Sequence, residues 1–373
     1  MTNKHNILFI LILFLFSCEE SNVNLPKGKE KRTPIAFNIL GVMDHSGMTK
    51  SLISSTEILE KTCTPKEQGG NGENIGIWAD RTEGGNTELN VLGNDTKLIF
   101  DKTTVGGNPY NPWNYSGEPK RWRDPDNGIY KFRAYYPTNI TIENMSDADN
   151  FVVVYNTFLM QKDLLVAYNK VEASTFDLRT PVPLRFRHAL AAIRFQVKFK
   201  EGYPENDALT SFWLENKETN GLSYIGMMVY GLSETDPEGI QWSESAYETK
   251  MYSWEDSEGV TFTDTQFATA YTGKNPTTGT GFTKNDGWLL IIPQKSEGTV
   301  TMHFKTKKGG NAEYNLTIPK ITGTDEKGEN PSGDYYLPGY RYTYTFTLTK
   351  TDADVTLSIA PWNQLDSSFE IPF

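Results

Sequence analysis

A length of 373 residues allows two domains, and a formal net charge of −11 argues against a nucleic acid or an anionic membrane surface as partner. Aromatic residues make up 13% of the chain and glycine is frequent, at 31 residues. With many Thr, Asn, Asp and Pro residues and no long helical period, this composition predicts an all-β protein.

The first residues have the pattern of an export signal. An apolar run over residues 7–16 is too short to span a bilayer as a helix. It ends at Ser17-Cys18, and a small residue before a cysteine resembles the lipobox of bacterial lipoproteins. We expect a signal peptide over residues 1–17 and lipid on the thiol of Cys18; the alternative is an ordinary cleaved signal with an incidental cysteine.

A polar segment follows, and we interpret residues 18–33 as a lipidated tether. Glu19 and Glu20 resemble the surface-export signal of lipoproteins from Bacteroidetes. The tether ends in a basic cluster that contains Arg32, which makes Arg32 the candidate site for an Arg-specific protease. A cut there would detach the lipid and leave the following apolar strand on the chain.

Alternating apolar residues predict the strands of a first domain over residues 34–180. A Pro-rich start and strong alternation then predict a core strand over residues 184–200, which we take as the first strand of a second domain over residues 181–373. The predicted strands of the first domain are 33–39, 74–79, 97–100, 129–137 and 151–155. Those of the second are 184–200, 209–215, 222–229, 287–294, 299–305, 312–318, 338–348 and 355–359.

Several of these strands carry sequence motifs. They are Phe-Arg-His-Ala-Leu-Ala-Ala-Ile from residue 186, Tyr-Lys-Phe-Arg-Ala-Tyr-Tyr-Pro from 130, Lys-Asp-Leu-Leu-Val-Ala from 162, Pro-Gln at 293 and Pro-Trp at 361. In this order, behind a lipobox, they resemble the fimbrillin-like (Mfa-like) lipoproteins of Bacteroidetes. The resemblance implies two tandem β-sandwich domains of transthyretin-like topology. It also implies a subunit of a protease-matured pilus (fimbrium), on the outer membrane at the cell surface, that contributes to adhesion.

Family members are thought to polymerise by exchanging β-strands, so the resemblance implies other pilus subunits as partners, a lipid anchor in the outer membrane, and a host or bacterial surface ligand. The tail, residues 367–373, is a candidate donor strand, because Phe369, Ile371 and Phe373 lie on one face of an extended chain. Whether the tail is donated or pairs within its own domain stays open at this point. The stalk, tip and anchor roles stay open as well.

The sequence offers no catalytic constellation, so we expect no enzyme, no cofactor and no metal site. His188 lies in a predicted core strand and is interpreted as a hydrogen-bonded structural residue. Cys63 is interpreted as a buried, unreactive thiol without a disulfide partner. Residues 124–128 are interpreted as a turn and not as a calcium loop, because the spacing of the EF-hand ligands is missing.

An alternative function rests on loops rich in aromatic residues. Exposed rings stack on sugars, so the chain could be a glycan-binding lipoprotein of a polysaccharide-uptake system. Exposed, coplanar rings would favour that function, whereas buried rings would favour the pilus subunit. The rings in question are Trp113, Tyr115, Trp122, Trp242, Tyr247 and Trp254.

Overall fold

The structure, a computed structural model, describes residues 32–43, 59–101, 112–144, 151–157, 159–160, 162–199, 208–216, 222–230, 239–247, 250–261, 268–269, 288–296, 300–306, 313–318, 321, 334–348 and 353–361. Nearly all regular structure in these ranges is β-strand. Helical turns occur at residues 59–63 and in the 3-10 helix η1 (Lys66–Gln68). The all-β prediction is therefore confirmed.

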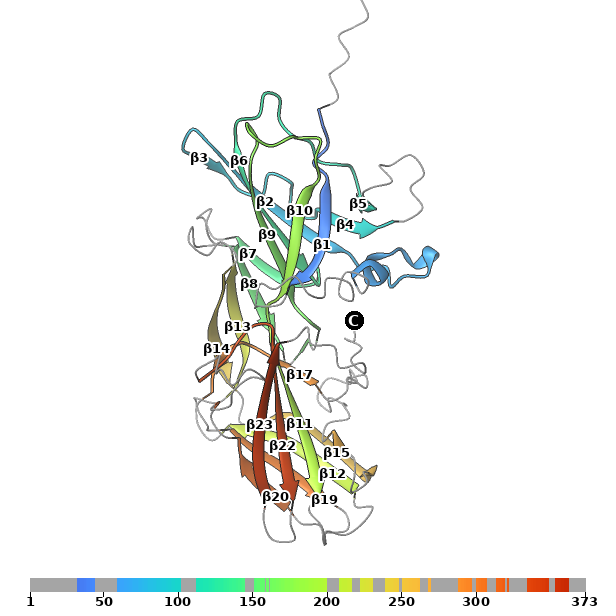
Figure 1. Cartoon of the computed structure of the whole chain (residues 1–373), viewed down its shortest axis with the longest axis vertical. Coiled ribbons are helices and arrows are strands. Elements are labelled where there is room, and N and C mark those ends of the chain that lie inside the picture. The colour runs from blue at the N-terminus through green and yellow to red at the C-terminus, as the bar shows by residue number, and fades with distance from the viewer. Residues whose placement is uncertain are drawn as a thin grey trace, which may run out of the picture.

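An eight-stranded sheet forms the upper part of the molecule (Figure 1). Its order is β1-β10-β9-β6-β2-β4-β5, with β3 paired to β2. All pairs in it are antiparallel except β1 with β10, which is parallel. The strands are β1 (Phe37–Met43), β2 (Ile75–Glu83), β3 (Asn86–Glu88), β4 (Lys97–Phe100), β5 (Trp113–Tyr115), β6 (Ile129–Tyr136), β9 (Leu165–Glu172) and β10 (Val182–His188).

The sheet curls until its two ends meet. Ile35, just before β1, donates its backbone N–H to the carbonyl of Lys120 at 2.8 Å, and Trp122 donates to the carbonyl of Thr33 at 3.0 Å. One face of the curled sheet encloses an apolar core with aromatic rings from several strands, such as Phe132, and from the segment before β6, such as Trp122. Closure gives the segment that leads into β1 a hydrogen-bonded neighbour on each side, which removes an open sheet edge at that point.

A four-stranded sheet packs on the other face of the eight-stranded sheet. Its order is β14-β13-β8-β7. Val153 and Tyr230 from it share a buried cluster with Trp78 and Tyr168 from the larger sheet. The strands are β7 (Thr141–Asn144), β8 (Phe151–Asn156), β13 (Ser223–Tyr230) and β14 (Ile240–Tyr247).

A buried ion pair lies between these two layers. Arg133 Nη1 is 2.7 Å from Asp80 Oδ2, and both side chains are almost fully buried. The guanidinium of Arg133 also lies 5.8 Å from the ring centroids of Phe151 and Tyr168. Asp80 accepts a second hydrogen bond from the indole of Trp78. A buried pair with this many partners fixes how the layers align, since a lone charge there would be strongly unfavourable.

The lower part of Figure 1 contains the remaining sheets. A five-stranded sheet has the order β16-β11-β22-β23 with β17 on β11, a four-stranded sheet has the order β15-β12-β19-β20, and β18 pairs with β21. Their strands are β11 (Ala191–Phe199), β12 (Ala208–Asn216), β15 (Lys250–Thr261), β16 (Ala268–Thr269), β17 (Trp288–Ile291), β18 (Gln294–Lys295), β19 (Val300–Thr306), β20 (Glu313–Thr317), β21 (Tyr335–Tyr336), β22 (Tyr340–Leu348) and β23 (Ala353–Pro361).

The sequence prediction lacks several of these strands, among them β9, β14 and β15. Two details of the predicted strands differ as well. The stretch 184–200 is not one strand: β10 ends at His188 in the eight-stranded sheet, and β11 begins at Ala191 in the five-stranded sheet. In addition, β13, expected in the second domain, pairs with β8 from the first. The change of sheet therefore falls at residues 189–190 and not at the expected boundary of 180/181. The division into two tandem sandwich domains stays a prediction.

Residues 189–190 lie between the two ladders: one of their hydrogen bonds continues the register of β10 with β9, and two others go to segments outside that pair. Ala189 donates its N–H to the carbonyl of Leu164 at 2.7 Å, and its own carbonyl accepts from the indole of Trp242 at 2.8 Å. The carbonyl of Leu190 accepts from the N–H of Gly339 at 2.9 Å. Both residues are fully buried, so these bonds satisfy groups that have no access to water.

Candidate functional site

The first described strand, β1, lies in a groove, and one wall of the groove is β10. Phe37 pairs with Val182 and Ile39 with Leu184 in parallel register, and Val182 donates its N–H to the carbonyl of Ala36 at 2.7 Å. The register shifts between Ile39 and Val42. The regular part of this wall therefore ends at Ile39.

The opposite wall is the segment 115–122, which follows β5. Besides the two backbone bonds given above, the hydroxyl of Tyr115 donates to the carbonyl of Ile35 at 2.8 Å. Burial raises the pKa of the Tyr115 hydroxyl well above its usual value, so it remains a proton donor. An isolated bridge between Pro34 and Arg121 completes this wall. The segment that leads into β1, residues 33–36, is thus bonded on both sides.

We call residues 33–39 the groove strand, and three of its side chains point into the core. Ile35 and Phe37 are 1% exposed and Ile39 is 5% exposed. The ring of Phe37 packs edge-on against Phe132, with centroids 5.4 Å apart, and against Tyr115 at 6.1 Å. Burying three such side chains is worth roughly 5–9 kcal/mol before ordering costs. The strand is therefore an integral part of the core, although it is the first strand that the structure describes.

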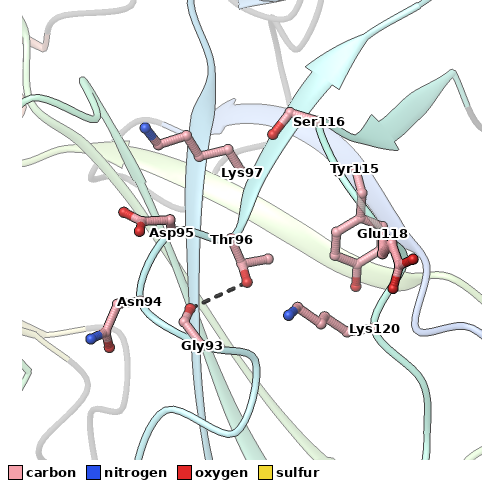
Figure 2. Close-up of a pocket in the computed structure, with 10 residues that line it drawn as sticks. Gly93, Asn94, Asp95, Thr96, Lys97, Tyr115, Ser116, Glu118 and Lys120 are labelled. Atoms are coloured by element: carbon pink, nitrogen blue, oxygen red, sulfur yellow. Dashed lines mark hydrogen bonds between the residues drawn. The ribbon is translucent and has the colours of Figure 1, made fainter.

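A polar depression of about 370 Å³ lies beside the 115–122 wall (Figure 2). Its floor is the turn before β4, where Thr96 donates its hydroxyl to the carbonyls of Leu92 and Gly93. The positive charges of Lys97 and Lys120 are balanced in number by the negative charges of Asp95 and Glu118, so the lining has no dominant charge. The lining residues are Gly93, Asn94, Asp95, Thr96, Lys97, Tyr115, Ser116, Gly117, Glu118 and Lys120.

Two of the sequence motifs meet at the end of β10. His188 Nδ1 lies 2.6 Å from Asp163 Oδ2, and both side chains are at most 2% exposed. Gly339 approaches the same histidine, since a Cβ at that glycine would lie 3.9 Å from the Cβ of His188. His188 therefore has a specific hydrogen-bonding partner, as expected of a structural histidine. Its contact with Asp163 joins the end of β10 to the segment before β9.

The described residues contain no group of three or more His, Cys, Asp and Glu side chains that could hold a metal ion. Cys63 is buried, and burial together with the nearby charge of Glu73 raises the pKa of its thiol to about 12. Such a thiol is a poor nucleophile at neutral pH. In the predicted turn, Asp126 accepts hydrogen bonds from protein donors, among them Tyr130 and Gly128. Although burial opposes it, these bonds hold the pKa of Asp126 below its usual value.

The tryptophans whose side chains the structure describes, Trp113, Trp122 and Trp242, do not form an exposed stacking platform. Trp113 and Trp122 are 5% and 1% exposed, and they pack edge-on against Phe100 and Tyr130. Trp242 is partly buried and hydrogen-bonded to Ala189. The side chains of Tyr247 and Trp254 lie outside the described residues. Burial of these rings favours a structural role over sugar binding.

The predicted site residues fall in different places. Arg32 is exposed at the start of the groove, and its carbonyl accepts a hydrogen bond from Arg121. Cys18 and the tail with Phe369, Ile371 and Phe373 lie outside the described residues. No helix within the described ranges is both long enough and apolar enough to cross a membrane.

Sequence reasoning missed the 115–122 wall. The sequence suggested only an aromatic loop there, because the wall forms a single isolated bridge and no regular strand. A usable signal was Trp122, a large apolar residue in a polar segment that ends shortly before β6. Such a residue in a loop indicates that the loop covers a core.

Comparisons with known proteins agree on one group. A family model described as fimbrillin-like matches residues 64–362. A solved structure of a fimbrial protein from Bacteroides vulgatus is 14% identical, covers 88% of this chain and 99% of its own, and has a TM-score of 0.54. A protein described as a cell adhesion protein from Bacteroides ovatus is 14% identical, covers 90% and 99%, and has a TM-score of 0.48. No curated protein matches the chain.

Proposed function

The chain belongs to the fimbrillin-like family, and on that premise we propose that it is a structural subunit of a surface pilus that contributes to adhesion. Family membership implies a place at the cell surface and association with other pilus subunits. We further propose a signal peptide over residues 1–17, lipid on Cys18 in the outer membrane, and two tandem β-sandwich domains. A glycan-binding role is not favoured, because the described tryptophans Trp113 and Trp122 are buried.

We propose that subunits join by strand exchange at the β1 groove. The observation that carries this proposal is the position of β1: it completes the core with Ile35, Phe37 and Ile39, yet it is parallel to β10 in an otherwise antiparallel sheet. Parallel pairing is slightly less stable per residue than antiparallel pairing. Loss of β1 would leave a two-walled apolar groove, and a strand from a neighbour would fill it with main-chain bonds and side-chain pockets.

Proteolytic maturation at Arg32 is part of the proposal. Arg32 is exposed and lies at the start of the segment bonded to the 115–122 wall. A cut after it would free the subunit from its lipid, whereas release of β1 would require a second event beyond Met43. The surface form should therefore begin at Thr33 if this cut is made; a different first residue would remove the assignment of Arg32 but not the role in a pilus.

Electron microscopy of cells with and without the gene tests the proposal as a whole. Loss of filaments in the deletion strain, restored by the intact chain, is the expected result. A chain with Phe37→Asp puts a charge into the apolar core of the free subunit and should keep it from folding, so it should not restore them, while a substitution of exposed Glu118 by Gln should. Filaments that persist unchanged without this chain would refute a structural role in the pilus.

A further inference from the structure

The peptide bond after Arg32, the proposed processing site, is held against the 115–122 wall. Arg121 donates from Nη1 to the carbonyl oxygen of Arg32 at 2.5 Å, and Trp122 donates its backbone N–H to the carbonyl of Thr33 at 3.0 Å. Arg32 itself is exposed. An Arg-specific protease can therefore reach the residue that it recognises, whereas the bond that it would cut is bound to the wall.

We propose that these contacts protect the bond between Arg32 and Thr33 while the groove strand lies in its groove, so that release of the strand must precede the cut. Arg121 is the residue that guards the bond. This inference rests on the proposed processing at Arg32 and adds its regulation: the lipid anchor is removed only from a subunit whose groove strand has left the core.

The chemistry of peptide hydrolysis needs the oxygen that Arg121 contacts. The nucleophile of a serine or cysteine protease attacks the carbonyl carbon, and N–H donors of the protease stabilise the negative charge that develops on the carbonyl oxygen. Water then hydrolyses the acyl-enzyme, which leaves a carboxylate on Arg32 and an amine on Thr33. The protease must enclose this oxygen, and the guanidinium of Arg121 stands in that space.

The residues that follow the bond are held more firmly still. A protease binds several residues on each side of the bond in an extended conformation through main-chain hydrogen bonds, so it needs the backbone of residues 33–35. Ile35 donates its N–H to the carbonyl of Lys120 at 2.8 Å, and its carbonyl accepts from the hydroxyl of Tyr115 at 2.8 Å. Its side chain is 1% exposed. The bond therefore becomes accessible only after Ile35 has left the core.

Opening of the bond is linked to opening of the groove, because the same residues serve both. Ile35 and Phe37 are buried on one face of the groove strand, and the carbonyl of Ala36 between them accepts from Val182 on the other wall. Fraying of residues 33–35 alone loses the wall bonds and the burial of Ile35, and it restores conformational freedom only to those residues. Release of the whole strand removes the protection completely.

Cleavage of the purified chain by an Arg-specific protease measures the protection. The chain would carry Cys18→Ala, so that it has no lipid, and mass spectrometry would identify the products. In the folded chain, the cut after Arg32 should be much slower than in a synthetic peptide of residues 27–39, which contains the same bond and no wall. Arg121→Ala should speed the cut in the folded chain by roughly two- to tenfold, because the closed state loses one hydrogen bond.

Arg123→Ala is the matched control, because it also removes an arginine from this part of the chain. The side chain of Arg123 pairs with Glu88, and its backbone N–H donates to Asp126. This variant should be cut after Arg32 at the rate of the parent. Equal rates for Arg121→Ala and Arg123→Ala would overturn the role of Arg121, and a parent chain that is cut as fast as the peptide would overturn the protection altogether.

A second variant tests the contact further along the strand. Tyr115→Phe removes the hydroxyl that bonds the carbonyl of Ile35 and keeps the ring that packs against Phe37. It should also speed the cut after Arg32. An unchanged rate would show that the protease does not need residue 35 to be free, which contradicts the proposal.

A reversible lock separates fraying from release of the whole strand. Asn38 and Pro183 are paired across β1 and β10 and both are half-buried, so Asn38→Cys with Pro183→Cys would join the strand to its groove by a disulfide. The oxidised chain should be cut after Arg32 several times more slowly than the reduced chain. Equal rates would show that fraying is sufficient, and the proposed order of release before the cut would be wrong.

These measurements are made on the isolated chain and require no filaments. Slow cleavage that Arg121→Ala relieves would support the guarded bond even if cells without the gene keep their filaments. Unprotected cleavage would refute the guarded bond and leave the role in a pilus as it stands. The inference and the proposed function therefore fail separately.

Discussion

Truncation of Phe37 should weaken the free subunit and spare the assembled pilus. Phe37 is 1% exposed and packs against the rings of Phe132 and Tyr115, so Phe37→Ala removes a large side chain from a packed site. Substitutions of this kind cost about 3–5 kcal/mol, from lost burial and from the cavity that remains. In the pilus, the proposed exchange replaces Phe37 by a side chain from the neighbouring subunit, so the truncated residue no longer contributes to the core.

Urea denaturation of the monomer and thermal dissociation of the polymer measure the two effects separately. The free energy of unfolding of the monomer should fall by about 3–5 kcal/mol, while the dissociation midpoint of the polymer should stay within error of the parent. Phe132→Ala is the matched control, because Phe132 is fully buried on β6 and remains in the core in either state. It should destabilise both.

Equal losses in monomer and polymer for Phe37→Ala would refute the reasoning, since they would mean that β1 stays in its groove after assembly. A monomer of unchanged stability would refute it as well, because the packing argument would then fail in the free subunit. The outcome of the control separates these cases from a general weakening of the core.

Three further predictions concern single side chains. Cys18→Ala should abolish metabolic labelling by a fatty-acid probe, and surviving label would exclude Cys18 as the lipidated residue. His188→Ala should lower the free energy of unfolding by roughly 1–3 kcal/mol, because it leaves the buried carboxylate of Asp163 without its partner, and metal analysis should find no stoichiometric ion. Cys63 should resist alkylation in the folded chain. Its pKa of about 12 against an ordinary 9.0 means that the unfolded state loses its proton first, so the stability it contributes is complete below pH 9 and declines as pH rises towards 12. Denaturation at pH 8 and at pH 10.5 should differ less in Cys63→Ala than in the parent.

The sequence by itself determined many of the strands and which of their faces are apolar, although it missed β9, β14 and β15. The alternation in β6 and β22 is local, since neighbouring side chains of a strand point to opposite faces whatever the strand pairs with. In β22, for example, Tyr342, Tyr344 and Phe346 are fully buried and alternate with the half-buried Thr343 and Thr345. The order of the five sequence motifs also indicated the fimbrillin-like family.

Only the tertiary structure decided which strands pair. Alternation does not specify a partner, so the sequence could not show that β1 is parallel to β10 or that β13 joins β8. The break at residues 189–190 was hidden for the same reason: Ala189 and Leu190 fit an apolar strand, and the ladder ends where Trp242 and Gly339 donate to their carbonyls.

The same limit applies to the candidate site. Ile35, Phe37 and Ile39 could be recognised as a strand face from the sequence, but the walls of their groove come from residues about 80 and 145 positions away along the chain. His188 could be interpreted as structural, yet its partner Asp163 is 25 residues away and belongs to a separate motif. Contacts over such separations depend on how the whole sheet closes, which is a property of the packed core and not of any one segment.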